Sequence, residues 1–137
     1  MNSKMIKELG VEKTKDWFRS LGISIFKPIG YNPKVDLVAE FNGKAQRIRV
    51  KAAKTAKNGK VRFDLNSSGR RMGVDVDTSG FDYYALYSID RNKLYLLKST
   101  EAPKVEVTIR FEDGKRNSKR IKKESIFEVE SVVSPSI

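Results

Sequence analysis

Two strand-like runs joined at Asn42-Gly43 constrain the fold of this chain more than any other feature of its sequence. The runs are residues 35–41 and 46–53, and an Asn-Gly pair between such runs is a strong signal for a two-residue β-hairpin turn. A second pair, Asn58-Gly59, leads into another run at residues 61–65. The middle of the chain is therefore predicted to be built from hairpins.

The remaining elements predict a single domain that combines one long helix with many strands. Residues 3–21 carry apolar side chains at three- and four-residue spacing, which predicts a helix with Ser3 as its N-cap, Gly22 as its stop and Gly10 as a weak point. Further strands are predicted at 23–26, 83–89, 94–97 and 105–111, loops at 28–33, 66–80 and 113–123, and a short helix or a final strand at 123–133. We expect one α/β (α+β) domain spanning residues 1–137.

Composition removes several kinds of chemistry. The chain has no cysteine and no histidine, so disulfides, thiolate or imidazole metal ligands and Ser-His triads are excluded. Its apolar runs stay well short of the ~20 residues that a bilayer span needs, and its start lacks the apolar stretch of a signal peptide. We expect a cytoplasmic protein with no membrane partner, whose chemistry uses Asp, Glu, Lys, Arg, Tyr or Ser.

The charge distribution favours a polyanionic partner. The formal net charge is +11 at pH 7, and basic residues are concentrated in two stretches, residues 44–71 and 115–123. Concentrated positive charge indicates nucleic-acid binding more than general solubility, although a basic thermophile protein or a ribosome-associated protein would share the composition. Five residues of the first stretch, set among small flexible ones, are predicted to contact DNA phosphates: Lys54, Lys57, Lys60, Arg70 and Arg71.

Asp36 and Lys51 form the pattern that carries chemistry. They lie on the two strands of the first hairpin, so their side chains can approach each other, and Arg49 shares a strand face with Lys51. Phosphodiester hydrolysis needs a divalent ion held by hard oxygen ligands, and a nearby lysine can orient the nucleophile or stabilise developing charge. Glu12 would add a carboxylate if the first helix packs across the hairpin.

At this point the chain resembles the PD-(D/E)XK nuclease superfamily, and more closely the small homing endonucleases of cyanobacterial group I introns. The resemblance covers roughly residues 5–125 and is carried by Gly10-Val11-Glu12, Val35-Asp36-Leu37-Val38, Ile48-Arg49-Val50-Lys51, Arg62-Phe63-Asp64-Leu65, Asp82-Tyr83-Tyr84-Ala85-Leu86-Tyr87 and Lys93-Leu94-Tyr95-Leu96-Leu97. It implies a restriction-endonuclease-like core, with a mixed central sheet flanked by helices.

The resemblance also implies an activity. Members of the superfamily are Mg²⁺- or Mn²⁺-dependent endonucleases, and a homo-oligomer, dimer or tetramer, is expected because cutting both DNA strands calls for two sites. On the matching positions, Asp36 and Glu12 would hold the metal, and Lys51 would be catalytic together with the residue at position 49. Homing, restriction and junction-resolving relatives leave open whether the substrate is duplex or branched DNA.

Arg49 is the departure from the family pattern, which has Glu, Asp or Gln at this position. A guanidinium has five donors and no acceptor, and it repels a divalent cation. The site can use Glu12 and Asp36 with Arg49 held against the phosphate. Alternatively, the protein has lost cleavage and kept DNA or partner binding, or the arginine is a substitution introduced to silence the enzyme.

Other acids compete for the roles given to Glu12 and Asp36. Glu8 competes with Glu12 on the helix, Asp64 and Glu40 are secondary candidates, and the pair Asp75 and Asp77 is expected to be a solvated loop. A third functional class, a basic RNA-binding structural protein with no catalytic site, is the weakest alternative.

Overall fold

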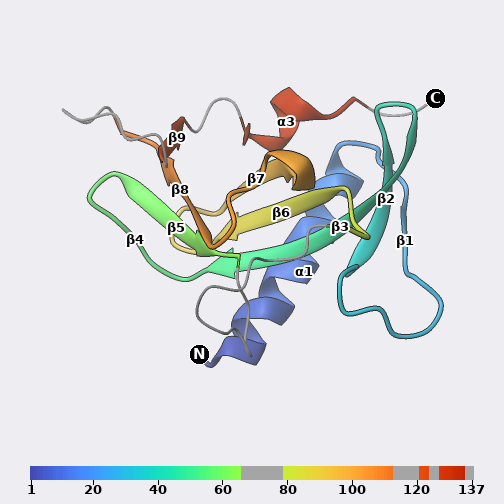
Figure 1. Cartoon of the computed structure of the whole chain (residues 1–137), viewed down its shortest axis with the longest axis horizontal. Helices are drawn as coiled ribbons and strands as arrows, with labels where there is room; N and C mark the ends of the chain where they lie inside the picture. The colour runs from blue at the N-terminus through green and yellow to red at the C-terminus, as the bar shows by residue number, and fades with distance from the viewer. Residues whose placement is uncertain (66–78, 113–120, 124–126, 135–137) are drawn as a thin grey trace.

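The computed structural model describes residues 1–65, 79–112, 121–123 and 127–134, which build two β-sheets and one long helix (Figure 1). The elements are α1 (Ser3–Ser20), β1 (Ile25–Phe26), β2 (Leu37–Phe41), β3 (Lys44–Ala53), β4 (Ala56–Lys57), β5 (Lys60–Asp64), β6 (Tyr83–Ser88), β7 (Lys93–Lys98), a 3₁₀ turn η1 (Ser99–Glu101), β8 (Glu106–Arg110), β9 (Ile121–Lys123) and α3 (Val129–Val132).

The first sheet has the order β1-β2-β3-β6-β7, and the second has the order β4-β5-β8-β9. In the first sheet β3 and β6 run parallel, whereas the other pairs are antiparallel, so the sheet is mixed. The predicted hairpin joins β2 to β3: Asn42 and Gly43 have φ values of 52° and 85°, the two positive values that a type I′ turn requires. Asn58 and Gly59, with φ of 55° and 73°, make the same kind of turn between β4 and β5.

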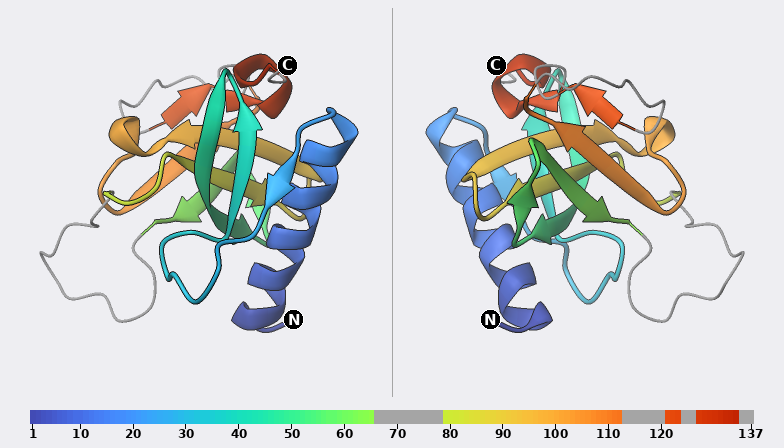
Figure 2. Two further views of the ribbon diagram at one scale, coloured as in Figure 1. Left: turned by 90° about the vertical axis from the view of Figure 1, so that its right-hand side faces the viewer. Right: turned by 90° about the vertical axis from the view of Figure 1, so that its left-hand side faces the viewer.

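The first sheet is covered on both faces. One core cluster contains Phe18 of α1 with Tyr83 and Ala85 of β6, and the other contains Tyr84 of β6 with Phe63 of β5. Successive β6 side chains point to opposite faces, which explains why this strand is apolar at nearly every position and buried throughout. Figure 2 shows α1 on one side of the first sheet, and β5 and β8 of the second sheet on the other side. The expected mixed-sheet α+β fold is confirmed, with a second sheet in the place of helices on one face.

Helix α1 docks closely on the sheet. Its N-cap is Asn2, whose side chain accepts the Met5 N–H at 2.9 Å, so the prediction of Ser3 as the cap is wrong by one residue. Gly10 is buried against β3, and a Cβ built there would lie 2.9 Å from Ala52 Cβ. Gly10 is therefore a close contact point between helix and strand, and not the weak point that helix propensity predicted.

Of the two alternatives left open for residues 123–133, the structure shows the short helix. A short strand, β9, occupies part of the expected charged loop and pairs in parallel with β8, and a short helix, α3, follows. Trp17 Nε1 of α1 donates to Glu130 Oε1 of α3 at 2.8 Å, which ties the two helices together. No helix in the described part of the chain is long and apolar enough to cross a membrane.

Candidate active site

Asp36 and Lys51 line the same pocket, as their place on the hairpin predicted. This pocket, called here the Asp36 pocket, has a volume of about 580 Å³. It lies where the N-terminal part of α1, the loop before β2, β3 and the end of β5 meet. Its lining consists of Ser3, Ile6, Lys7, Tyr31, Asn32, Pro33, Asp36, Arg49, Lys51, Ala52 and Asp64.

Strand register brings the charged side chains together. Leu37 pairs with Ile48, and the Asp36 N–H donates to the Ile48 carbonyl at 2.8 Å, so Asp36 lies opposite Arg49 one step beyond the last pair of the β2–β3 ladder. Ile48 and Val50 point into the core under α1. Side chains alternate along a strand, so Arg49 and Lys51 point to the other face, into the pocket.

The carboxylate of Asp36 is held from two sides. Its Oδ2 accepts the Val50 N–H at 2.7 Å and a hydrogen bond from Lys7 Nζ at 2.8 Å. The same Lys7 ammonium donates to the Val50 carbonyl. The side chain of Asp36 is only 22% exposed, so these contacts fix its position at the mouth of the pocket.

Lys51 is half-buried, and its environment changes its titration. Burial is the main cause that lowers its pKa to about 8, followed by the positive charges of Arg49 and Lys7. Asp64 and Asp36 act in the opposite direction, which shows that both carboxylates are close enough to influence the amine. A lysine whose pKa lies this close to neutrality can exchange its proton under mild conditions, a property that suits general acid–base chemistry.

Arg49 places a permanent positive charge in the pocket. Its guanidinium carbon lies 5.8 Å from the centre of the Phe81 ring, within range for a cation–π contact. Tyr84, the neighbour of Arg49 in the β3–β6 ladder, also experiences its charge. Since a guanidinium binds planar anions well and cannot accept a hydrogen bond, this position suits a phosphate and not a metal.

Glu12 is not among the residues that line the Asp36 pocket. Its side chain is 64% exposed and pairs with Lys15 at 3.2 Å. Gly10 faces β3, and two residues further along a helix is a rotation of about 200°, so Glu12 points away from the sheet. Glu8, the competing acid, is also exposed. The structure therefore does not bring a helix carboxylate to Asp36.

Lys7 is the helix residue that reaches the pocket, and sequence reasoning missed it. It lies on the same helix face as Thr14 and Phe18, both of which are buried against the sheet. The place of Lys7 on the buried face of an amphipathic helix was a signal that it has a partner. That signal does not identify the partners, which are 29 and 43 residues away in the chain and are brought to Lys7 by the docking of α1.

The oxygen ligands in the pocket suit one divalent ion. Two carboxylates, Asp36 and the secondary candidate Asp64, line it, and the Val50 carbonyl is close to the first. Among the described residues no group of three or more acidic side chains comes together, and Glu40 is not part of the pocket. Mg²⁺ is commonly held by one or two carboxylates with substrate oxygens and waters, so this set fits a single ion. Asp75 and Asp77 lie outside the described residues.

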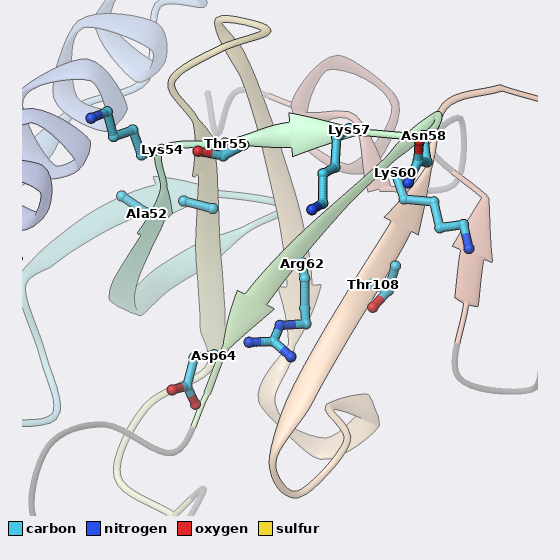
Figure 3. A pocket seen from close by; sticks show the side chains of 10 residues that line it. Ala52, Lys54, Thr55, Lys57, Asn58, Lys60, Arg62, Asp64 and Thr108 are labelled. Atoms are coloured by element: carbon cyan, nitrogen blue, oxygen red, sulfur yellow. The ribbon is translucent and has the colours of Figure 1, made fainter.

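A second pocket adjoins the first and is called here the basic groove. It has a volume of about 750 Å³ and shares Ala52 and Asp64 with the Asp36 pocket. Figure 3 shows Lys57 on β4, with Lys60, Arg62 and Asp64 following along β5. Its full lining is Ala52, Ala53, Lys54, Thr55, Lys57, Asn58, Lys60, Arg62, Asp64 and Thr108.

Three of the five predicted phosphate contacts therefore lie in one groove. Lys54, Lys57 and Lys60 are exposed there, close to the Asp36 pocket. Arg70 and Arg71 lie outside the described residues. On β5, Val61 and Phe63 point into the core, so Lys60, Arg62 and Asp64 point outward into the groove.

Comparison with known proteins gives a consistent result. A family model described as PD-(D/E)XK endonuclease matches residues 1–130. The structure of a bacterial homing endonuclease, I-Ssp6803I, superimposes with a TM-score of 0.64 over 87% of this chain and 83% of that one, at 20% sequence identity. That likeness shows a shared fold. No curated protein matches the chain.

Proposed function

The chain belongs to the PD-(D/E)XK endonuclease family, and from this premise we propose that it binds DNA and hydrolyses a phosphodiester bond in the Asp36 pocket. The observation that supports this proposal is the meeting of Asp36 and Lys51, from two neighbouring strands, in one pocket beside a basic groove. An acid can hold the metal that such a reaction uses, and a nearby lysine can orient the nucleophile or stabilise the developing charge.

The proposed cofactor is Mg²⁺ or Mn²⁺. Asp36 and Asp64, which line the pocket, would hold it together with the Val50 carbonyl, which shares the Lys7 ammonium with Asp36, because all three are hard oxygen ligands. When bound, such an ion polarises the phosphoryl oxygen and lowers the pKa of a water molecule. Glu12, which was expected to assist, points away from this place.

Lys51 and Arg49 act on the phosphate in this proposal. Lys51 orients the attacking water or stabilises the charge that develops on the phosphoryl oxygens, and its pKa of about 8 permits it to exchange a proton at neutral pH. Arg49, with its fork of donors, holds the phosphate in line with them.

The basic groove binds the phosphates that flank the reacting one. Lys54 just before β4, Lys57 on β4 and Lys60 on β5 supply positive charge. The shared residue Asp64 makes the groove continuous with the Asp36 pocket. We further propose that the protein acts as a homo-oligomer, because cutting both strands of a duplex requires two sites. Analytical ultracentrifugation tests this, and a monomer at all concentrations would contradict it.

A second candidate function is DNA binding without cleavage. It is favoured by the three cations Lys7, Arg49 and Lys51 that line the pocket, and by the ion pair between Lys7 and Asp36. These features make the pocket attractive to a phosphate while reducing its affinity for a divalent ion.

A plasmid-nicking assay with Mg²⁺ or Mn²⁺ separates the two candidates. The chain, Lys51→Ala and Arg49→Gln are compared at equal DNA occupancy. Cleavage by the chain that is abolished in Lys51→Ala supports the hydrolytic function. Salt-sensitive DNA binding with no cleavage by the chain would favour the second candidate, and cleavage that appears only in Arg49→Gln would identify the arginine as the silencing residue.

A further inference from the structure

The ammonium of Lys7 lies in a place suited to a cation. It donates to a carboxylate oxygen, Asp36 Oδ2, at 2.8 Å, and also to the main-chain carbonyl of Val50. The Asp36 oxygen is fixed in turn by the Val50 N–H at 2.7 Å. A carboxylate and a backbone carbonyl that converge on one point are hard oxygen ligands, the type that binds Mg²⁺.

The same two groups are needed for the proposed metal. A divalent ion bound to Asp36 and the Val50 carbonyl would lie beside the Lys7 ammonium, and the two cations would repel each other strongly. Arg49 and Lys51 line the same pocket and add to this repulsion. Binding of one cation therefore opposes binding of the other.

We propose that the Lys7 ammonium is a built-in cation that occupies this position, and that a divalent ion binds only in exchange for it. This inference rests on the proposed metal-dependent function of the Asp36 pocket. Lys7 then competes with the divalent ion and raises the concentration of metal that is needed to fill the site.

The position of Lys7 permits the exchange. Its side chain is 40% exposed and comes from the second turn of α1, so the ammonium can withdraw toward solvent without disturbing the core. A lysine side chain has four flexible carbons, and its ammonium is strongly hydrated once it is released.

The test is a titration of Mn²⁺ into the full chain without DNA, followed by the electron paramagnetic resonance signal of unbound Mn²⁺. Lys7→Met keeps the length of the side chain and removes the competing charge. We expect it to bind Mn²⁺ about tenfold more tightly than the unmodified chain, because the binding-competent state no longer has to form. Asp36→Asn added to Lys7→Met should remove this binding.

Two further variants serve as controls. Lys4→Met removes an exposed charge from the same helix, outside the pocket, and should leave the Mn²⁺ affinity unchanged. Lys7→Arg keeps a cation and should keep the affinity low. Thermal unfolding confirms that each variant is folded.

The proposal is overturned if folded Lys7→Met binds Mn²⁺ no more tightly than the unmodified chain, or if Lys4→Met gives the same gain. These results are independent of the nicking assay. A gain in Mn²⁺ affinity in Lys7→Met, without any DNA cleavage by the chain, would support the exchange and contradict the hydrolytic function. Cleavage by the chain, with no change of Mn²⁺ affinity in Lys7→Met, would support the hydrolytic function and contradict the exchange.

Discussion

The Asp36 pocket and the basic groove share two residues, Ala52 and Asp64, yet they differ in how their charges are held. In the pocket, Lys7 is held by a carboxylate and a carbonyl, Arg49 lies by an aromatic ring, and Lys51 is half-buried. In the groove, Lys54, Lys57 and Lys60 are exposed on a short hairpin. Opposite charges that are held in fixed positions suit a reaction, whereas the exposed lysines of the groove suit non-specific binding of phosphates.

The largest expected effect is a loss of cleavage rate when a residue of the Asp36 pocket is replaced, but not when a residue of the basic groove is replaced. Lys51→Ala should lower the rate of plasmid nicking by about 10²–10³-fold, the usual cost of removing one group that stabilises developing charge. Its DNA affinity should change little, since one pocket cation among many is lost. Lys57→Ala, in the groove, is the matched control and should retain most of the cleavage rate at saturating protein. Equal losses of rate in the two variants would contradict the division into a catalytic pocket and a DNA-binding groove.

Substitutions in the basic groove should mainly weaken DNA binding. A triple variant, Lys54→Ala with Lys57→Ala and Lys60→Ala, should weaken DNA binding roughly tenfold at moderate salt. The slope of log K against log salt should fall by about 0.9 for each phosphate contact removed. Fluorescence anisotropy over a range of salt concentrations measures both. An unchanged slope would show that these lysines do not contact the DNA backbone.

A change in how closely α1 packs on β3 should alter the Asp36 pocket and leave the basic groove unchanged. Gly10→Ala places a methyl group 2.9 Å from Ala52 Cβ, which forces α1 away from β3. Overpacking of this kind costs about 1–3 kcal/mol of unfolding free energy, and the shift should displace Lys7 from Asp36. Thermal denaturation measures the first effect. The salt slope of DNA binding should stay the same, and a variant as stable as the unmodified chain would contradict the close contact.

A smaller effect concerns the titration of Lys51. The charge of Arg49 is the second cause, after burial, that lowers the pKa of Lys51 to about 8, so Arg49→Gln should raise that pKa. Arg62→Gln, in the groove, should leave it unchanged, because Arg62 is not among the groups that influence Lys51. Nuclear magnetic resonance of the Lys51 side chain across pH measures the shift. A pKa that does not rise in Arg49→Gln would show that the two side chains are not coupled.

The same pKa predicts how stability depends on pH. The folded-state pKa of Lys51, about 8, is below its ordinary value of 10.5, so the folded state disfavours the protonated amine. The contribution of Lys51 is therefore unfavourable below about pH 8, and stability should rise as the pH increases from about 8 toward 10.5. Lys51→Met should lack this rise in denaturant titrations, and an identical profile in both chains would contradict the shift.

Local signals explain why much of the fold was predictable. The Asn-Gly pairs specify their own turns, and strand β6 shows its burial on both faces by consecutive apolar residues. Asp36 and Lys51 were predictable as neighbours because one hairpin carries both. Their meeting needs no long-range information.

The rest of the site depends on packing between distant segments. Helix α1 meets β3 through the face that carries Gly10, and this docking brings Lys7 to the pocket and turns Glu12 away from it. Asp64 arrives through the pairing of β5 with β8, far along the chain. Helix propensity and motif spacing contain neither fact, so sequence reasoning named Glu12, which does not line the pocket, and omitted Lys7, which does.

The most direct test of the account is the nicking rate of Asp36→Asn measured beside its DNA affinity. Asparagine keeps the shape of the side chain but removes the charge that would hold a divalent ion. Cleavage with Mg²⁺ or Mn²⁺ should be lost in this variant, while DNA binding is retained or slightly strengthened because the pocket becomes more positive. Undiminished cleavage by Asp36→Asn would show that the reaction takes place elsewhere, and would contradict the assignment of the Asp36 pocket as the active site.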